Sequence, residues 1–218
     1  MTAILNWDRV VRFTVCSWFF FLATGLAVNL QDMIETATTG LDFARLFSKS
    51  CVFTFILLMG WLTLIRSQPT TRAEGWQPRI SAVLGTNLIL VGMIFLAPRT
   101  DLSISMHFLS ASLILIGNAI AIYTISHLGR SFSIMAEARR LVTNGPYRIV
   151  RHPLYIAEQI SIIGVAILYA SPLAAALVLA QFGFQLRRML NEEALLKASF
   201  PEYAAYMDRT ARLIPTVW

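Results

Sequence analysis

A short polar stretch between two long apolar segments carries the side chains best suited to chemistry. It runs from Asn144 to Glu158 and consists of N-G-P-Y-R-I-V-R-H-P-L-Y-I-A-E. Pro153 suits the first turn of a helix, where a missing backbone N–H costs nothing. The apolar run that follows predicts a membrane helix, so Arg151 and His152 should lie at its N-terminus. Free backbone amides and positive charge at that point favour an anionic ligand.

Three acidic side chains and one arginine are the other candidates. Glu158 lies five residues after Pro153 and inside the next apolar run. A carboxylate there is costly unless it is paired or functional, or unless it still reaches the solvated interface. Glu192 and Glu193 follow Arg188 by four and five residues. They form either ordinary ion pairs on a solvated helix or the far wall of a site that faces the polar stretch.

The remaining reactive side chains do not form a recognisable centre. His107 and His127 stand alone at the two ends of one apolar segment, 20 residues apart, which is not the spacing of a metal site. Cys16 and Cys51 fall inside apolar runs and are expected to be buried thiols. Neither a glycine-rich phosphate loop nor an H-E-x-x-H motif occurs. We therefore predict no metal.

The composition indicates a membrane protein. Of the 218 residues 56% are hydrophobic and 14% are charged, whereas a soluble domain carries about 25% charged residues. The deficit is concentrated in uncharged runs long enough, or nearly so, to cross a bilayer as helices. We therefore predict an all-α, polytopic integral membrane protein that forms a single membrane domain. The runs are Phe13–Gln31, Ser50–Ile65, Ile80–Pro98, Leu102–Gly129 and Gln159–Leu186.

Two of these runs need interpretation. The second is short, and we expect Lys49 and Arg66 at its ends to extend toward the headgroups. The last is interrupted at Ser171-Pro172 and is either one kinked helix or a helical hairpin of Leu154–Ala170 and Pro172–Arg188. The hairpin places 15 Lys and Arg residues inside and 3 outside, against 10 and 8 for the kinked helix. The positive-inside rule therefore favours the hairpin.

The predicted topology has about six transmembrane helices and both termini in the cytoplasm, most simply in the cytoplasmic membrane. Residues 1–128 hold transmembrane helices 1–4, and residues 129–218 hold the last two, the polar stretch and a cytoplasmic C-terminal tail. This topology also accounts for the net charge of +6, together with attraction to anionic headgroups. We predict no nucleic-acid binding, because no basic patch interleaved with aromatic residues occurs.

Three blocks in the C-terminal two-fifths resemble a known family. The first is L-V-T-N-G-P-Y-R-I-V-R-H-P-L-Y, residues 141–155, and the second is the hairpin broken at Ser171-Pro172. The third is R-R-M-L-N-E-E-A-L-L-K-A-S-F-P-E-Y-A-A-Y, residues 187–206, followed by R-L-I-P. In this order and spacing they resemble the isoprenylcysteine carboxyl methyltransferase family, which is itself similar to the membrane phospholipid methyltransferases.

The resemblance implies S-adenosylmethionine as methyl donor, bound on the cytoplasmic side between the R-H-P segment and the tail. Arg188 matches a basic position just before the acidic pair. Arg139-Arg140 stand where many members have a histidine, Ala157 replaces a common glycine, and F-P-E-Y replaces F-G-x-E-Y. The positions that match the donor-binding motifs are Gly145, Tyr147, Arg151, His152, Pro153, Tyr155, Glu192 and Glu193.

Such a site could work as follows. Arg151 suits the donor's carboxylate, the acidic pair suits its hydroxyls or ammonium, and Tyr147 and Tyr155 suit its sulfonium. The acceptor should come from the bilayer, because the other walls of the site are membrane helices. A carboxylate acceptor is already ionised and needs no base, so Arg188 would only steer it. An amine acceptor needs a base, for which Glu158 is the candidate.

We therefore predict an S-adenosylmethionine-dependent membrane methyltransferase that acts on a lipid or lipid-like acceptor. Isoprenylcysteine-type carboxyl O-methylation is the closest activity, and phospholipid amine N-methylation is the second. One alternative is an NADPH-dependent sterol-type reductase, whose cofactor phosphate Arg139 and Arg140 could bind. Another is a transporter or a subunit of a membrane complex. The oligomeric state stays open.

Overall fold

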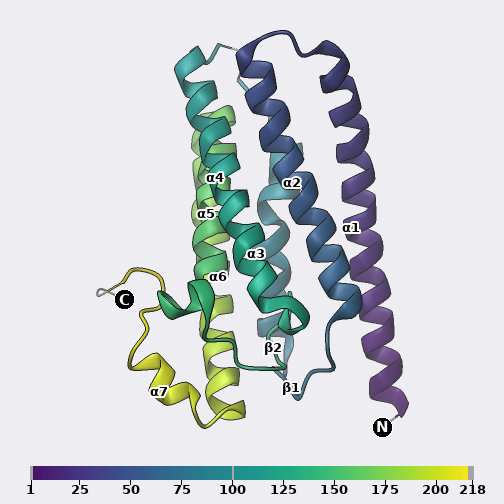
Figure 1. Ribbon diagram of the computed structural model, residues 1–218, viewed down its shortest axis with the longest axis vertical. Helices are drawn as coiled ribbons and strands as arrows, with labels where there is room; N and C mark the ends of the chain where they lie inside the picture. The colour runs from purple at the N-terminus through teal and green to yellow at the C-terminus, as the bar shows by residue number, and fades with distance from the viewer. Residues whose placement is uncertain (1, 100, 216–218) are drawn as a thin grey trace.

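The structure is a computed structural model, and it describes residues 2–99 and 101–215. The described residues are mostly helical, and the long helices stand side by side in an elongated bundle (Figure 1). We call the lower end in that view, where α7 and both strands lie, the site end, and the upper end the remote end. The long helices are α1 (Thr2–Thr36), α2 (Gly40–Ile65), α3 (Trp76–Ile94), α4 (Ile104–Leu128), α5 (Pro153–Tyr169) and α6 (Pro172–Ser199).

Short elements gather at the site end. Strands β1 (Thr71–Arg72) and β2 (Glu137–Ala138) pair antiparallel, so the α2–α3 connection is joined to the segment that follows α4. Two 3-10 turns, η1 (Gly129–Ser131) and η2 (Gly145–Arg148), and the short helix α7 (Tyr203–Met207) complete this end.

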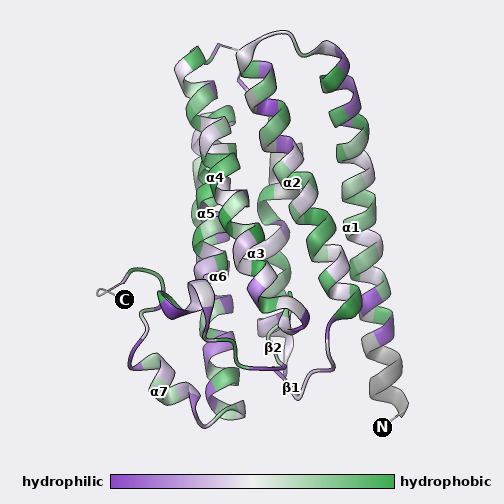
Figure 2. Ribbon diagram, viewed as in Figure 1, coloured by the Kyte–Doolittle hydropathy of each residue, from purple (hydrophilic) through white to green (hydrophobic). Residues whose placement is uncertain are grey.

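The bundle is that of an integral membrane protein. Three segments of the described chain are long and apolar enough to cross a membrane, namely Arg12–Thr36, Gly40–Ile65 and Ile104–Ser131, and α5 is apolar but shorter. Large apolar side chains such as Phe20, at 74% exposed, cover the outside of the helices. A bilayer, unlike water, accommodates such a surface. Hydrophilic residues are most frequent toward the site end and its connections (Figure 2).

Local capping explains where two of the helices begin. Thr39 and Asp42 form a capping box at the start of α2, in which each side chain accepts a hydrogen bond from the other residue's backbone N–H. Ser171 caps α6 and Pro172 is its first residue. Ala170, with φ of 39°, lies between α5 and α6 in the left-handed region. The chain therefore passes from α5 to α6 in two residues.

The structure differs from the expectation for the second apolar run. Helix α2 begins at Gly40, ten residues before Ser50, because the capping box rather than the first charged residue sets its start. Lys49 therefore lies inside the candidate span Gly40–Ile65 and not at its end. Its ammonium donates a hydrogen bond to Asn29 Oδ1 on α1. The expectation that Lys49 stands at a helix end is wrong.

Close contact between α4 and α5 sets the height of α5 in the bundle. A Cβ on Gly117 would lie 2.3 Å from Ser161 Oγ, and one on Gly164 would lie 2.9 Å from the Ser110 carbonyl oxygen. The Ser110 hydroxyl also donates to the Gly164 carbonyl at 2.7 Å. Because no side chain fits at either glycine, the two helices pack backbone to backbone. This packing holds the first turn of α5 at the site end.

Helix α6 is held in a similar way by α3. Gly85 lies against the backbone of Gln185, where an added Cβ would be 3.6 Å from the Gln185 nitrogen. One turn away, the buried Gln181 amide donates to the Gly85 carbonyl at 3.0 Å. These contacts fix the rotation of α6 and so decide which of its polar side chains turn inward.

Candidate functional site

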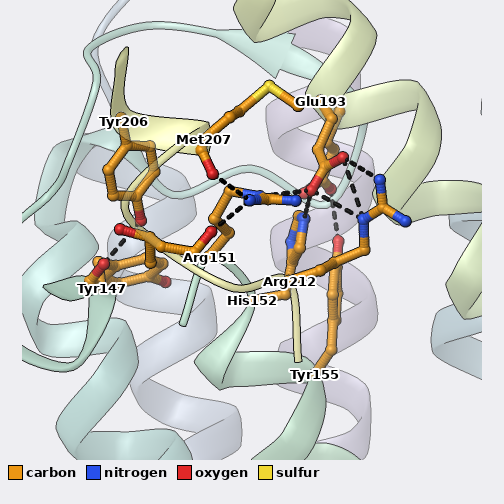
Figure 3. A network of polar contacts seen from close by, with 10 residues as sticks. Tyr147, Arg151, His152, Tyr155, Glu193, Tyr206, Met207 and Arg212 are labelled. Carbon is orange, nitrogen blue, oxygen red and sulfur yellow. Dashed lines mark hydrogen bonds and ion pairs between the residues drawn. The ribbon is translucent and has the colours of Figure 1, made fainter. Parts of the chain in front are cut away.

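The segment before α5 and the end of α6 meet around one buried carboxylate, that of Glu193 (Figure 3). It accepts hydrogen bonds from Arg151 Nε at 2.8 Å, His152 Nε2 at 3.1 Å and Arg212 Nη2 at 2.6 Å. Burial raises the pKa of Glu193, but the hydrogen bonds from His152, Arg212 and Arg151 outweigh it and hold this pKa well below the ordinary value. The carboxylate is therefore ionised and joins three parts of the chain.

The chain that follows α7 folds back over the segment before α5. Val150 and Ala211 form a parallel bridge, and the Arg151 N–H donates to the Ala211 carbonyl at 2.8 Å. Arg151 Nη1 donates to the carbonyls of Met207, at 3.0 Å, and of Thr210. The Arg151 guanidinium is thus already held by protein groups on two sides.

The η2 turn is held by contacts with α7 and α4. The Tyr206 hydroxyl of α7 donates to the Tyr147 carbonyl at 2.7 Å. Burial raises the pKa of Tyr206 to about 12, so this hydroxyl stays a donor at neutral pH. Gly145 has a φ of 57°, and a Cβ there would lie 2.3 Å from His127 Cδ2 on α4. Glycine is therefore required both by the backbone conformation and by the close approach of His127.

A second cluster lies one turn further along α5. The Tyr155 hydroxyl donates to Glu192 Oε1, and Arg188 Nε lies 3.2 Å from the same oxygen. The Arg188 guanidinium carbon is 5.0 Å from the centre of the Tyr155 ring, in a cation–π arrangement. The His152 ring stacks on the Tyr155 ring, with ring centres 5.4 Å apart.

Arg188 also reaches into the bundle. Its Nη1 donates to Thr86 Oγ1 on α3 at 3.2 Å, and its Nη2 donates to the Ser133 carbonyl at 3.4 Å. The side chain is only 5% exposed. The Arg188 guanidinium is therefore held in one orientation by partners on several elements. Glu158 accepts a hydrogen bond from Gln185 Nε2 at 2.8 Å.

Arg188 lines one cavity and is hydrogen-bonded to a residue that lines a second one. One lies at the site end and is polar and aromatic, with Ser133, Arg140, Tyr147, Arg151, His152, Tyr155, Arg188 and Glu192 among its lining residues. The other lies inside the bundle between α1, α2, α3, α4 and α5 and is lined mostly by apolar side chains. Thr86 and Glu158 belong to the wall of this inner cavity. Arg188 therefore lines the polar cavity while its hydrogen-bond partner Thr86 lines the apolar one.

A third charged cluster supports the polar cavity. Glu137 on β2 pairs with Arg72 at 3.1 Å, with Arg66 at 3.7 Å and with Arg139. These pairs join the end of α2 to both strands. Arg140, the next residue, is exposed on the cavity wall and makes no hydrogen bond or ion pair with any residue in the described ranges. Its guanidinium is therefore available to a ligand.

The structure brings most of the predicted site residues together at the site end. Pro153 is the first residue of α5, as its sequence context predicts. Glu158 lies apart, on the inner cavity. His107 lies toward the remote end and contacts Arg45 Nη2 at 2.8 Å. Among the side chains that the structure describes, no three of His, Cys, Asp or Glu gather as a metal site. The residues brought together are Gly145, Tyr147, Arg151, His152, Tyr155, Arg188, Glu192 and Glu193.

Sequence reasoning missed four contributors to this arrangement. Thr86 and Gln185 lie within apolar helices, and a single polar residue in such a run does not show which neighbour it will face. His127 stands alone in the sequence, and its close approach to Gly145 is a tertiary contact. Glu137 is one acidic residue in a basic connection, with no motif around it.

Comparison with known proteins identifies the C-terminal region. Residues 105–203 match the family model described as phospholipid methyltransferase. The family resemblance is confirmed over this part of the chain. Protein-S-isoprenylcysteine O-methyltransferase B of Arabidopsis thaliana is 32% identical over 113 residues, which cover 49% of this chain and 57% of that protein. The residues matched by the family model thus include Arg188, Glu192 and Glu193, whereas Arg212 lies beyond them.

Two bacterial relatives match as well. The nickel-cobalt-cadmium resistance protein NccN of Alcaligenes xylosoxydans xylosoxydans is 31% identical over 110 residues, 49% of this chain and 52% of that protein. The cobalt-zinc-cadmium resistance protein CzcN of Cupriavidus metallidurans is 34% identical over 76 residues, 34% of this chain and 35% of that protein. The chain spans about half the length, or less, of the relatives named here.

Proposed function

We propose that this protein transfers a methyl group from S-adenosylmethionine to a lipid or lipid-like acceptor that enters from the membrane. Isoprenylcysteine-type carboxyl O-methylation is the closest activity. The observation that carries the proposal is one buried cation, Arg188, which lines the polar cavity and is hydrogen-bonded to Thr86 on the wall of the apolar one. A polar donor and an apolar acceptor need different surroundings, yet their reacting atoms must come within contact distance.

The polar cavity has the side chains that this donor requires. S-adenosylmethionine, when bound, supplies an electrophilic methyl group on a sulfonium. Glu192 would accept hydrogen bonds from hydroxyl or ammonium groups, and the Tyr147 and Tyr155 rings would face a cation. We assign the donor's carboxylate to Arg140, whose guanidinium is available, rather than to Arg151, whose donors already bind Glu193 and two carbonyls.

Arg151, His152 and Glu193 then have a different role in this proposal. They hold the chain after α7 against the start of α5, and so form one wall of the donor site. The aromatic side chains on that wall exclude water from one side of the cavity. Exclusion of water strengthens the electrostatic interactions inside such a site.

The position of Arg188, between the polar cavity and Thr86 on the wall of the apolar one, favours an anionic acceptor. Arg188 is buried, it is oriented by Glu192, the Tyr155 ring and Thr86, and it lies where the acceptor's reactive end would meet the donor. A guanidinium binds a carboxylate through paired hydrogen bonds, and an ionised carboxylate needs no base. An amine acceptor is the second candidate, because Glu158 on the inner cavity could take its proton. The positive charge of Arg188 makes an amine the less suited of the two acceptors.

The test combines a binding measurement with a transfer measurement. The purified full chain should bind S-adenosylhomocysteine and should transfer label from the methyl donor into a lipid extract. We expect Arg188→Ala to lower transfer by about 100-fold or more while S-adenosylhomocysteine binding changes less than about threefold. Arg140→Ala should weaken that binding by about tenfold. Arg187→Ala, an exposed neighbour on the same helix, is the matched control and should leave both unchanged.

Other outcomes would contradict the proposal. Binding of NADPH without binding of S-adenosylhomocysteine would favour a reductase. Transfer that is equal in the Arg187 and Arg188 variants would remove Arg188 from the reaction. Lipids extracted from cells with and without the protein, compared by mass spectrometry, would identify the methylated class.

A further inference from the structure

The inner cavity has a second polar end that the methyl-transfer site does not use. Most of its wall is apolar, and Thr86 and Glu158 lie on the part nearest Arg188. Asn29 on α1 and Lys49 on α2 belong to the same wall. Both lie in the remote half of their helices. A cavity built only to hold a hydrocarbon chain has no use for a cation at its far end.

Lys49 lies well inside a candidate membrane span. The candidate spans Gly40–Ile65 and Arg12–Thr36 have their midpoints near Val52 and Thr24. At 1.5 Å per residue, Lys49 and Asn29 lie only about 5 and 8 Å along the helix from those midpoints. The hydrocarbon of a bilayer extends about 15 Å on each side of its middle. Lys49 therefore lies within the candidate span and not beyond its end, and its ammonium donates to Asn29 Oδ1 on α1.

The charge of Lys49 has no acidic counterpart in the described part of the chain. Its hydrogen bond goes to the neutral amide oxygen of Asn29. The next cation along α2 behaves differently, because Arg45 contacts Asp42 at 4.0 Å and His107 at 2.8 Å. An ammonium inside a membrane protein is costly unless it is paired, and unpaired ones mark sites for ions or ligands. An anion in the cavity would complete this site.

We propose that Lys49 and Asn29 bind an anionic group at the end of the acceptor opposite to its methylated end. This rests on the proposed function and names its substrate class, a long-chain molecule with polar groups at both ends. Along α2, the cavity wall from Met59 to Lys49 covers ten residues, or about 15 Å of helix. The apolar middle of the molecule would lie along this wall. Its reactive end would meet Arg188.

The test uses two probes that differ only at the far end, tetradecanedioic acid and tetradecanoic acid. Binding of each radiolabelled acid is measured to the purified full chain in a neutral detergent. We expect the wild-type protein to bind the diacid about tenfold more tightly. Lys49→Met should abolish that preference by weakening the diacid alone, and Lys49→Arg should retain it. Lys49→Met removes a half-buried charge and keeps the apolar length of the side chain, so the fold should survive.

Arg45→Met is the matched control, because Arg45 is another cation on the same helix and does not line the cavity. It should leave the preference unchanged. Equal binding of the two acids by the wild-type protein would overturn the inference, and so would an equal loss of preference in Arg45→Met. The readout is independent of methyl transfer. A protein that prefers the diacid but does not bind S-adenosylhomocysteine would keep the anion site and reject the proposed reaction.

Discussion

At the scale of single residues, the two neighbouring carboxylates Glu192 and Glu193 have different roles. The resemblance assigns both Glu192 and Glu193 to the donor, but their surroundings differ. Glu192 lines the polar cavity, whereas Glu193 is turned toward Arg151, His152 and Arg212. An acidic pair next to each other on a helix points in two directions, so sequence alone could place the pair at the site but could not divide its roles.

The role of Glu193 gives a prediction. Glu193→Gln removes the negative charge that Arg151, His152 and Arg212 share, and breaking a buried ion pair costs about 3–5 kcal/mol. We expect trypsin to cleave the variant more rapidly than the wild-type protein after Arg212, the arginine of the tail that Glu193 holds. Glu202→Gln, the same change at an exposed position of the tail, should not alter the cleavage rate. Unchanged protection in Glu193→Gln would mean that other contacts hold the tail.

The same carboxylate makes the tail sensitive to acid. Its pKa is lowered in the folded protein from an ordinary value of 4.5. A lowered pKa stabilises the docked tail fully above pH 4.5, and this contribution is lost as the pH falls from there toward the folded pKa. Protection of the tail, measured by hydrogen exchange, should therefore weaken progressively below pH 4.5. In Glu193→Gln this part of the pH dependence should be absent.

At the scale of elements, the η2 turn links α4, α5 and α7. We expect Gly145→Ala to be strongly damaging, because the left-handed conformation costs a residue with a Cβ about 1–2 kcal/mol and the Cβ would clash with His127. S-adenosylhomocysteine binding should fall about tenfold or more. His127→Ala removes the clash but not the conformational cost, so the double variant should recover only part of the affinity. Full recovery, or no loss in the single variant, would contradict this account.

Elements also show which sequence signals were reliable. The starts of α5 and α6 follow from Pro153 and from Ser171-Pro172, since capping and proline act within one turn of the chain. The start of α2 did not follow from the charge pattern, because Thr39 and Asp42 extend the helix past three charged residues, Asp42, Arg45 and Lys49. The pairing of β1 with β2 joins segments more than 60 residues apart and left no local pattern to detect.

At the scale of the whole molecule, the bundle and the charge pattern together define an orientation. The N-terminal end of α1, the strands and α7 all lie at the site end, and the α1–α2 connection lies at the remote end (Figure 1). The basic residues counted as inside by the positive-inside rule are those of the site end. We propose six membrane-crossing helices with the site end in the cytoplasm, where S-adenosylmethionine is made.

Single cysteines test this orientation. The background is a chain in which Cys16 and Cys51 are replaced by serine. Thr38→Cys lies in the α1–α2 connection and Glu202→Cys lies just before α7, and both positions are exposed. A membrane-impermeant maleimide added to intact spheroplasts should label only Thr38→Cys, and in inside-out vesicles it should label only Glu202→Cys. Labelling of both positions from one side would mean that an even number of helices crosses the membrane between Thr38 and Glu202. The proposed topology, in which α2 to α6 all cross, would then be wrong. The polar cavity would then no longer be assigned to the side that supplies the donor.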